Sequence, residues 1–144
     1  MEILQNFPRM FPVENIHDIR TMSITDVGLL KLMSASNRLA KKDIYDLDII
    51  TDTVPLADLL NTLRIKRAKY CHEKDKSLFD LDDEKSPTEE IEILLDFDNR
   101  NYASNHLRPS HSNDLIDIMD NSKNWRIARS SWLKKVKLLF KIID

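Results

Sequence analysis

The sequence predicts a mainly α fold, a bundle of about five to six helices that follows a short N-terminal extended segment or strand. The 144 residues include one glycine and five prolines, which is little material for the tight turns of a many-stranded sheet. Apolar residues recur at helical spacing in several segments, and serine or proline stands where those segments begin. We therefore expect residues 1–144 to form a single helical domain.

The composition is typical of a folded protein in a reducing compartment. Apolar residues make up 42% of the chain and charged residues 32%. The single cysteine, Cys71, excludes an internal disulfide. Residues 1–12 lack the apolar core of a signal peptide, and no apolar run approaches the roughly 20 residues that span a bilayer. We expect a cytoplasmic protein that does not associate with a membrane.

Residues 1–22 are predicted to be an extended lead-in. Pro8 and Pro12 exclude a continuous helix, and the apolar residues around them favour an extended segment or a short strand. The later sequence offers no convincing partner for such a strand. This suggests that the chain is part of something larger.

A core of three helices is expected over residues 23–72, and Ser23 is positioned to cap the first of them. Gly28 lies inside this helix, where it lowers helix propensity, so close packing is a reason for its presence. Lys31 lies among the apolar residues of the same helix. Its ammonium either extends to water or reaches a phosphate in a cleft, and the residues alone leave both interpretations open.

The second helix is expected to begin at Asp43, after a break over residues 34–41. Asp43 and Asp46 are three positions apart, so their carboxylates share one side of the helix. An aspartate near a helix N-terminus is favoured electrostatically whatever its function. The spacing by itself is therefore weak evidence for a site.

The third helix is predicted to have Pro55 in its first turn. It ends in a basic cluster, which either complements the helix dipole or faces a phosphate. The members of this cluster are Arg64, Lys66, Arg67 and Lys69.

Residues 73–144 are predicted to be a divergent acidic segment followed by a basic C-terminal helix. Within 76–85, Leu78, Phe79 and Leu81 are candidates for burial. A helix is expected from the cap at Ser86 to about Phe97, then a loop, and a short helix over 114–120. The last helix should run from about 125 to 143. Its apolar residues suit docking against the domain, and its basic residues also resemble a membrane-surface helix. The apolar residues in question are Trp132, Val136, Leu139 and Phe140.

The net charge of −2 conceals an asymmetry between two segments. Residues 73–98 contain eleven acids and three lysines, whereas residues 123–141 contain seven basic residues and no acid. One interpretation is two solvated faces that attract each other within the fold. The other is a basic helix that approaches phosphates and an acidic segment that repels them.

Four segments in order resemble the AbiEii/AbiGii family of nucleotidyltransferase toxins. SITDVGLLKLMSASNR (23–38) resembles a serine-capped helix of that family with an internal lysine, and RLAKKDIYDLDII (38–50) resembles its basic and acidic segment. KSLFDLDDEKSP (76–87) and SSWLKKVKLLF (130–140) resemble two later segments. Residues 1 to about 87 and 130–144 are covered, and 91–125 resemble a local divergence or insertion.

The resemblance implies roles for residues at the matching positions. Lys31 would contact nucleotide phosphates and Asp43 would be an active-site carboxylate, so these two are the catalytic candidates. The candidates for nucleotide binding are Arg38, Lys42 and Asp46.

The family also carries a preceding catalytic core, with a glycine-containing turn and metal-binding aspartates on a mixed sheet. The only glycine of this chain is Gly28, and no metal ligand is expected in it. Mg²⁺ and a nucleoside triphosphate are expected only if another polypeptide completes the missing half.

The resemblance therefore implies a truncated or split nucleotidyltransferase toxin-family protein that is inactive alone. Its expected partners are an antitoxin or a complementing N-terminal polypeptide, and tRNA or another nucleic acid. The alternative is a non-catalytic helical interaction module that binds an antitoxin or nucleic acid. A decayed gene product without a present function is a third possibility.

Overall fold

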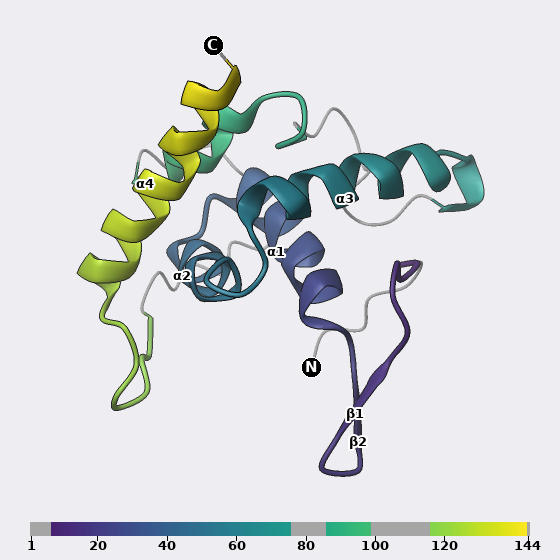
Figure 1. Ribbon diagram of the computed structural model, residues 1–144, viewed down its shortest axis with the longest axis horizontal. Helices are drawn as coiled ribbons and strands as arrows, with labels where there is room; N and C mark the ends of the chain where they lie inside the picture. The colour runs from purple at the N-terminus through teal and green to yellow at the C-terminus, as the bar shows by residue number, and fades with distance from the viewer. Residues whose placement is uncertain (1–6, 76–85, 99–115, 144) are drawn as a thin grey trace, which may run out of the picture.

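The structure is a computed structural model, and it describes residues 7–75, 86–98 and 116–143 (Figure 1). The predicted mainly α fold is confirmed, and the N-terminal segment, predicted to be extended or a short strand, forms two short strands. In chain order the elements are β1 (Glu14–Ile16), β2 (Ile19–Thr21), α1 (Ile24–Arg38), α2 (Lys41–Ile50), α3 (Leu56–Lys69), η1 (Glu73–Asp75), η3 (Ile91–Asp98) and α4 (Trp125–Ile143), where η marks a 3₁₀ helix.

The lead-in supplies a partner for its own strand. β1 pairs with β2 in antiparallel register, with Ile16 opposite Ile19. His17 and Asp18 form the turn with φ of 48° and 63°, the left-handed conformation that a two-residue hairpin turn requires. The expectation that no partner strand would be found is therefore wrong, because the partner lies in the same segment. Figure 1 shows this hairpin extending away from the helices.

Asp26 anchors the lead-in to the start of α1. Ser23 Oγ accepts a hydrogen bond from the Asp26 backbone N–H (3.1 Å), which confirms the predicted cap. The Asp26 carboxylate is fully buried and accepts from the backbone N–H groups of Met10 (2.9 Å) and Phe11 (3.0 Å) and from the Ser23 hydroxyl (3.0 Å). These bonds satisfy a charged group inside the protein.

The junction between α1 and α2 is tighter than predicted. Only Leu39 and Ala40 separate the two helices, so the expected break over 34–41 is too wide and α2 begins at Lys41 rather than at Asp43. Ser36 lies inside α1, where its hydroxyl donates to the Met33 carbonyl (3.0 Å) of the same helix and caps no new helix. The chain turns at Leu39, whose φ of 51° is left-handed.

The core lies where α1 meets the other helices. α1 packs against α2, α3 and η3, and α4 packs against α2, α3 and η3. Gly28 allows α1 to approach α3, since a Cβ at this position would lie 2.9 Å from a methyl carbon of Leu59. The prediction that Gly28 serves close packing is consistent with this geometry. Fully buried core residues include Leu29, Leu32, Leu47, Leu59, Leu94, Trp132 and Val136.

The later segments depart from the prediction in two places. Residues 86–90 form a turn, and the following helix is the 3₁₀ helix η3 rather than an α-helix that starts at the cap. The Leu94 carbonyl of η3 accepts a hydrogen bond from the Trp132 indole N–H of α4 (2.9 Å), so a side chain of α4 satisfies a backbone group of η3. Residues 116–120 are not helical, which corrects the short helix expected over 114–120. The burial candidates Leu78, Phe79 and Leu81 lie outside the described residues.

The bounds predicted for the last helix are confirmed by α4. Trp132 and Val136 are fully buried, and Leu139 and Phe140 pack partly buried against the core. This is the docked arrangement rather than a free amphipathic helix. None of the helices among the described residues has the length and apolar character needed to cross a membrane.

Candidate functional site

Three of the residues predicted from the resemblance come together between α1 and α2. Lys31 extends from α1, and its Nζ lies 3.2 Å from Asp43 Oδ1 and 2.5 Å from Asp46 Oδ2. Asp43 is completely buried, whereas the side chains of Asp46 and Lys31 are 43% and 27% exposed. The shared side of Asp43 and Asp46 follows from their spacing of three. We call these residues the Lys31 cluster.

The Lys31 cluster carries one positive and two negative charges. Burial acts to lower the pKa of Lys31, but the hydrogen bond to Asp46 and the attraction of both carboxylates outweigh it, so the pKa lies above its usual value. Lys31 is therefore charged and already paired. In this arrangement the lysine joins two helices, and an anion would have to compete with both aspartates for it.

The other two predicted residues are not part of this cluster. Lys42 lies in the first turn of α2, is partly buried, and makes no ion pair with the described residues. Arg38 ends α1, and its side chain lies outside the part of the chain that the structure describes. The roles of all five residues in nucleotide chemistry stay predictions.

The residues present do not fit a Mg²⁺ site by themselves. Asp43 and Asp46 are the two carboxylates of the Lys31 cluster, and the ammonium group of Lys31 neutralises part of their charge. Mg²⁺ prefers several oxygen ligands in octahedral geometry. Within residues 7–75, 86–98 and 116–143, no three His, Cys, Asp or Glu side chains gather as potential metal ligands.

A second ionic cluster joins the C-terminal end of α2 to α4, and sequence reasoning missed it. Asp48 accepts from Lys123 Nζ (2.6 Å) and Lys135 Nζ (2.9 Å), and Asp52 accepts from the same two ammonium groups (2.5 and 2.6 Å). The two aspartates and two lysines form a closed ring of four ion pairs. We call this the carboxylate–lysine ring.

The ring had a partial signal in the sequence. Asp48 lies one turn after Ile44 on the buried side of α2 and is itself 0% exposed. A carboxylate on an apolar side needs a partner of opposite charge. Its partners are 75 and 87 residues away in the sequence, so local spacing did not identify them.

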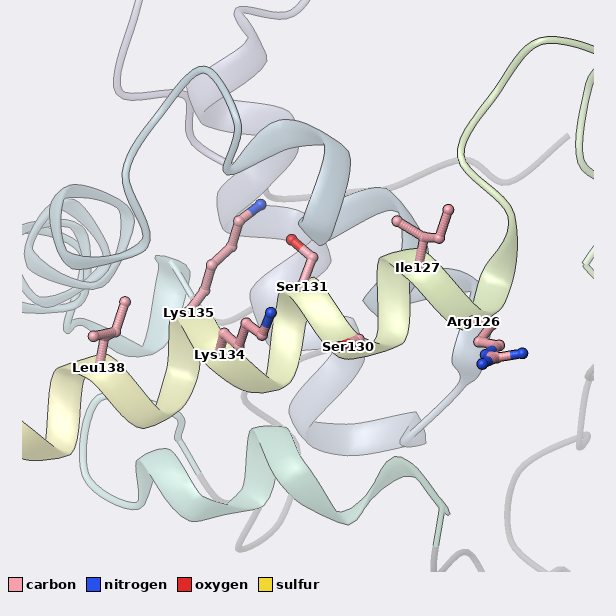
Figure 2. Close-up of a pocket in the computed structure, with 7 residues that line it drawn as sticks. All are labelled: Arg126, Ile127, Ser130, Ser131, Lys134, Lys135 and Leu138. Atoms are coloured by element: carbon pink, nitrogen blue, oxygen red, sulfur yellow. The ribbon is translucent and has the colours of Figure 1, made fainter.

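An open groove of about 460 Å³ runs along the solvent side of α4, next to the ring (Figure 2). Figure 2 shows the side chains of Ile127, Ser131 and Lys135 projecting from the same side of the helix. Ile127 and Leu138 are 55% and 57% exposed. The groove is lined by three cations, two serines and two aliphatic residues: Arg126, Lys134, Lys135, Ser130, Ser131, Ile127 and Leu138.

The basic residues of α4 do not all remain available. Lys135 and the preceding Lys123 are neutralised in the ring, whereas Arg126, Lys134 and Lys137 are exposed. Arg126, Lys134 and Lys137 are eight and three positions apart, so they lie on one side of the helix. We call the exposed surface formed by Arg126, Ile127, Ser130, Ser131, Lys134, Lys137 and Leu138 the α4 outer face.

The basic cluster of α3 is less suited to an external anion. Lys66 is 7% exposed, and its Nζ lies 3.1 Å from the centre of the Phe7 ring. This places the charge under the lead-in rather than towards solvent. Arg64 and Lys69 remain exposed. Within the basic cluster of α3, Lys66 therefore packs inside the protein, whereas Arg64 and Lys69 lie on its surface.

Comparisons of the chain with protein-family models, with curated proteins and with solved structures find no match. The two ionic clusters and the α4 outer face are the features of the molecule that bear on its function. Of these, only the α4 outer face presents several cations to solvent without a carboxylate bound to them in the described contacts.

Proposed function

We propose that the chain is a helical interaction module that binds the phosphate backbone of a nucleic-acid duplex through the α4 outer face. The observation that carries the proposal is the line of exposed cations Arg126, Lys134 and Lys137 beside an open groove. Along the helix axis this line extends about 16 Å. Ser130 and Ser131 add hydroxyl donors, which are common contacts to phosphate oxygens.

A duplex suits this surface better than a single strand. Proteins that bind single strands stack bases on aromatic side chains, and the residues that line the groove are cationic, hydroxyl-bearing or aliphatic. A rigid helix with charges at fixed spacing matches the regular phosphates of a duplex. The whole chain carries −2, so attraction must come from this local surface rather than from net charge.

The proposal predicts how strongly the affinity for duplex DNA depends on salt concentration. Each phosphate contact to duplex DNA contributes about −0.9 to the slope of log K against log salt. Three contacts predict a slope of about −2.7, which is about a 40-fold loss of affinity between about 50 and 200 mM salt. A probe of about 20 base pairs, two helical turns, is long enough for one such face.

The test is fluorescence anisotropy of this duplex with the full chain and with a triple variant, Arg126→Gln, Lys134→Gln and Lys137→Gln. We expect the triple variant to lose measurable binding. The matched control removes equal charge from exposed positions at the other basic region, with Arg64→Gln, Lys69→Gln and Lys74→Gln. This control should keep the wild-type affinity within about twofold.

Two results would contradict the proposal. Equal loss in the control triple variant would show that binding does not depend on the α4 outer face. In the second result, poly-glutamate displaces the labelled duplex at a lower concentration of negative charge than unlabelled duplex needs. That result would indicate that the ligand is an acidic protein surface, such as that of the antitoxin predicted as an alternative partner. A single-stranded probe and an RNA hairpin, measured in parallel, separate a preference for duplexes from general attraction to phosphates.

A second candidate function is the role implied by the resemblance, half of a nucleotidyltransferase active site. The observation that favours it is the meeting of Lys31 with Asp43 and Asp46, three residues to which the resemblance gives related roles. Such a site would need a complementing polypeptide to bring the nucleotide and Mg²⁺.

The test of this second function is reconstitution with a candidate N-terminal polypeptide, with nucleotide transfer to tRNA as the readout. Transfer should fall at least 100-fold with Lys31→Met and remain near wild type with Lys74→Met, at an exposed position to which the resemblance gives no role. Activity that is unchanged in Lys31→Met would remove the Lys31 cluster from the site.

A further inference from the structure

Lys135 lines the groove, yet its charge is directed into the carboxylate–lysine ring. Its Nζ donates to Asp52 Oδ1 (2.6 Å), to the Asp48 carbonyl and carboxylate (2.7 and 2.9 Å) and to Thr51 Oγ1 (3.0 Å). Figure 2 shows its side chain extending from α4 towards the neighbouring helical layer. This cation of the groove is thus held by acceptors on α2 and on the turn that follows it.

The two aspartates of the ring differ in exposure. Asp48 is 0% exposed, so it belongs to the packed junction between α2 and α4. Asp52 is 47% exposed, and it reaches Lys123 and Lys135 from the solvent side. Hydrogen bonds from Lys123 and then Lys135 hold the pKa of Asp52 below its ordinary value, so Asp52 is ionised at neutral pH. The ring as a whole is neutral.

We infer that Asp52 sets the affinity of the α4 outer face for anions, because it neutralises Lys135 beside the groove and limits the face to three available cations. The inference rests on the proposed function and names a residue that regulates it. Asp52 itself does not contact the ligand. It acts through Lys135, so it is a positioning residue and its effect should appear in the number of ions released on binding.

Charge counting predicts the effect of each substitution. Asp52→Asn leaves two ammonium groups with the single carboxylate of Asp48, so the ring changes from neutral to +1. The slope of log K against log salt should then change from about −2.7 to about −3.6. Lys135→Gln changes the ring to −1 but leaves the three available cations in place, so the slope should stay near −2.7. The double variant restores a neutral ring and should return to about −2.7.

The experiment measures binding of the same duplex between about 50 and 200 mM salt for these three variants and the wild type. Asp18→Asn is the matched control, because it makes the same charge change at the exposed tip of the hairpin, away from α4 in Figure 1. Asparagine also accepts the left-handed conformation of this position. Far-ultraviolet circular dichroism of every variant checks that the helices are retained.

A steeper slope with Asp52→Asn, its return in the double variant, and no change with Asp18→Asn would support the inference. A wild-type protein that binds the duplex while Asp52→Asn leaves the slope at the wild-type value would overturn the inference alone. Equal steepening with Asp18→Asn would also overturn it, since net charge would then be sufficient. Absence of binding in both the wild type and Asp52→Asn would overturn the proposed function together with the inference.

Discussion

Lys135 Nζ lies 2.9 Å from a carboxylate oxygen of Asp48, although 87 residues separate the two in the sequence. Asp48 is completely buried, and Lys123 reaches its other oxygen at 2.6 Å. A single carboxylate of α2 therefore holds both the start of the C-terminal region and the middle of α4. The stability of the α2–α4 junction should depend on this carboxylate.

Replacing Asp48 by Asn should lower the free energy of unfolding by about 2–3 kcal/mol. Loss of one partner of a buried ion pair costs about 3–5 kcal/mol, and the partial exposure of both lysines reduces this value. Urea denaturation followed by circular dichroism measures the change. Asp58→Asn, at an exposed position of α3, should stay within about 0.5 kcal/mol of the wild type. A loss for Asp48→Asn as small as that of Asp58→Asn would show that the ring contributes little.

The Lys31 cluster should show coupling between its members. Lys31→Met removes the lysine that contacts the buried Asp43 carboxylate, and we expect a loss of about 1–2 kcal/mol in the free energy of unfolding. Adding Asp43→Asn removes the buried charge, so the double variant should be less destabilised than the sum of the single variants by about 0.5–1 kcal/mol. A double-mutant cycle in urea measures this difference. Strict additivity would mean that the two residues do not interact in solution.

Lys31 should also make stability fall at alkaline pH. Its pKa in the folded protein lies above the ordinary value of 10.5, so the unfolded chain loses this proton first as pH rises. The stabilisation is complete below about pH 10.5 and is lost as the pH rises through the folded pKa. Urea midpoints at about pH 9 and pH 11 should therefore differ less in Lys31→Met than in the wild type. Identical differences in the two proteins would contradict a raised pKa for Lys31.

The close contact at Gly28 predicts that the effect of Gly28→Ala on the free energy of unfolding depends on the side chain at position 59. Alanine in place of glycine gains about 1 kcal/mol of helix propensity, but its Cβ would lie 2.9 Å from one methyl carbon of Leu59 and 3.2 Å from one of Ile50. Overpacking of this kind costs about 1–3 kcal/mol, so Gly28→Ala should be destabilising in the wild type. In a Leu59→Ala background the closest contact is removed and only the 3.2 Å contact with Ile50 remains, so the same change should be less destabilising than in the wild type. Stabilisation in both backgrounds would show that α1 and α3 are not in close contact.

Local chemistry was sufficient to predict several elements of the fold. The bounds of α4 followed from helical periodicity that extends over 19 residues, and the start of α1 followed from the cap at Ser23. The α1–α2 junction was predicted too wide because serines usually favour caps and turns. Here Ser36 bonds to a carbonyl of its own helix and remains inside it.

In the candidate sites, too, some features follow from local spacing and others depend on long-range packing. The shared side of Asp43 and Asp46 follows from their spacing, whereas the contact with Lys31 depends on how α1 packs against α2. The ring and the exposure of Arg126, Lys134 and Lys137 depend on where α4 docks, and a count of basic residues cannot distinguish neutralised from available cations. Long-range packing therefore decides which charges can act.

The two tryptophans of the chain, Trp125 and Trp132, are both on α4. Trp132 is fully buried and donates to the Leu94 carbonyl, and the Trp125 ring meets the Phe97 ring edge to face at 5.9 Å. Intrinsic fluorescence is therefore an optical reporter of the α4–η3 contact, whereas circular dichroism averages over all helices. If α4 detaches before the remaining helices melt, the fluorescence transition will precede the dichroism transition, and the protein will contain its own probe for the release of its C-terminal helix.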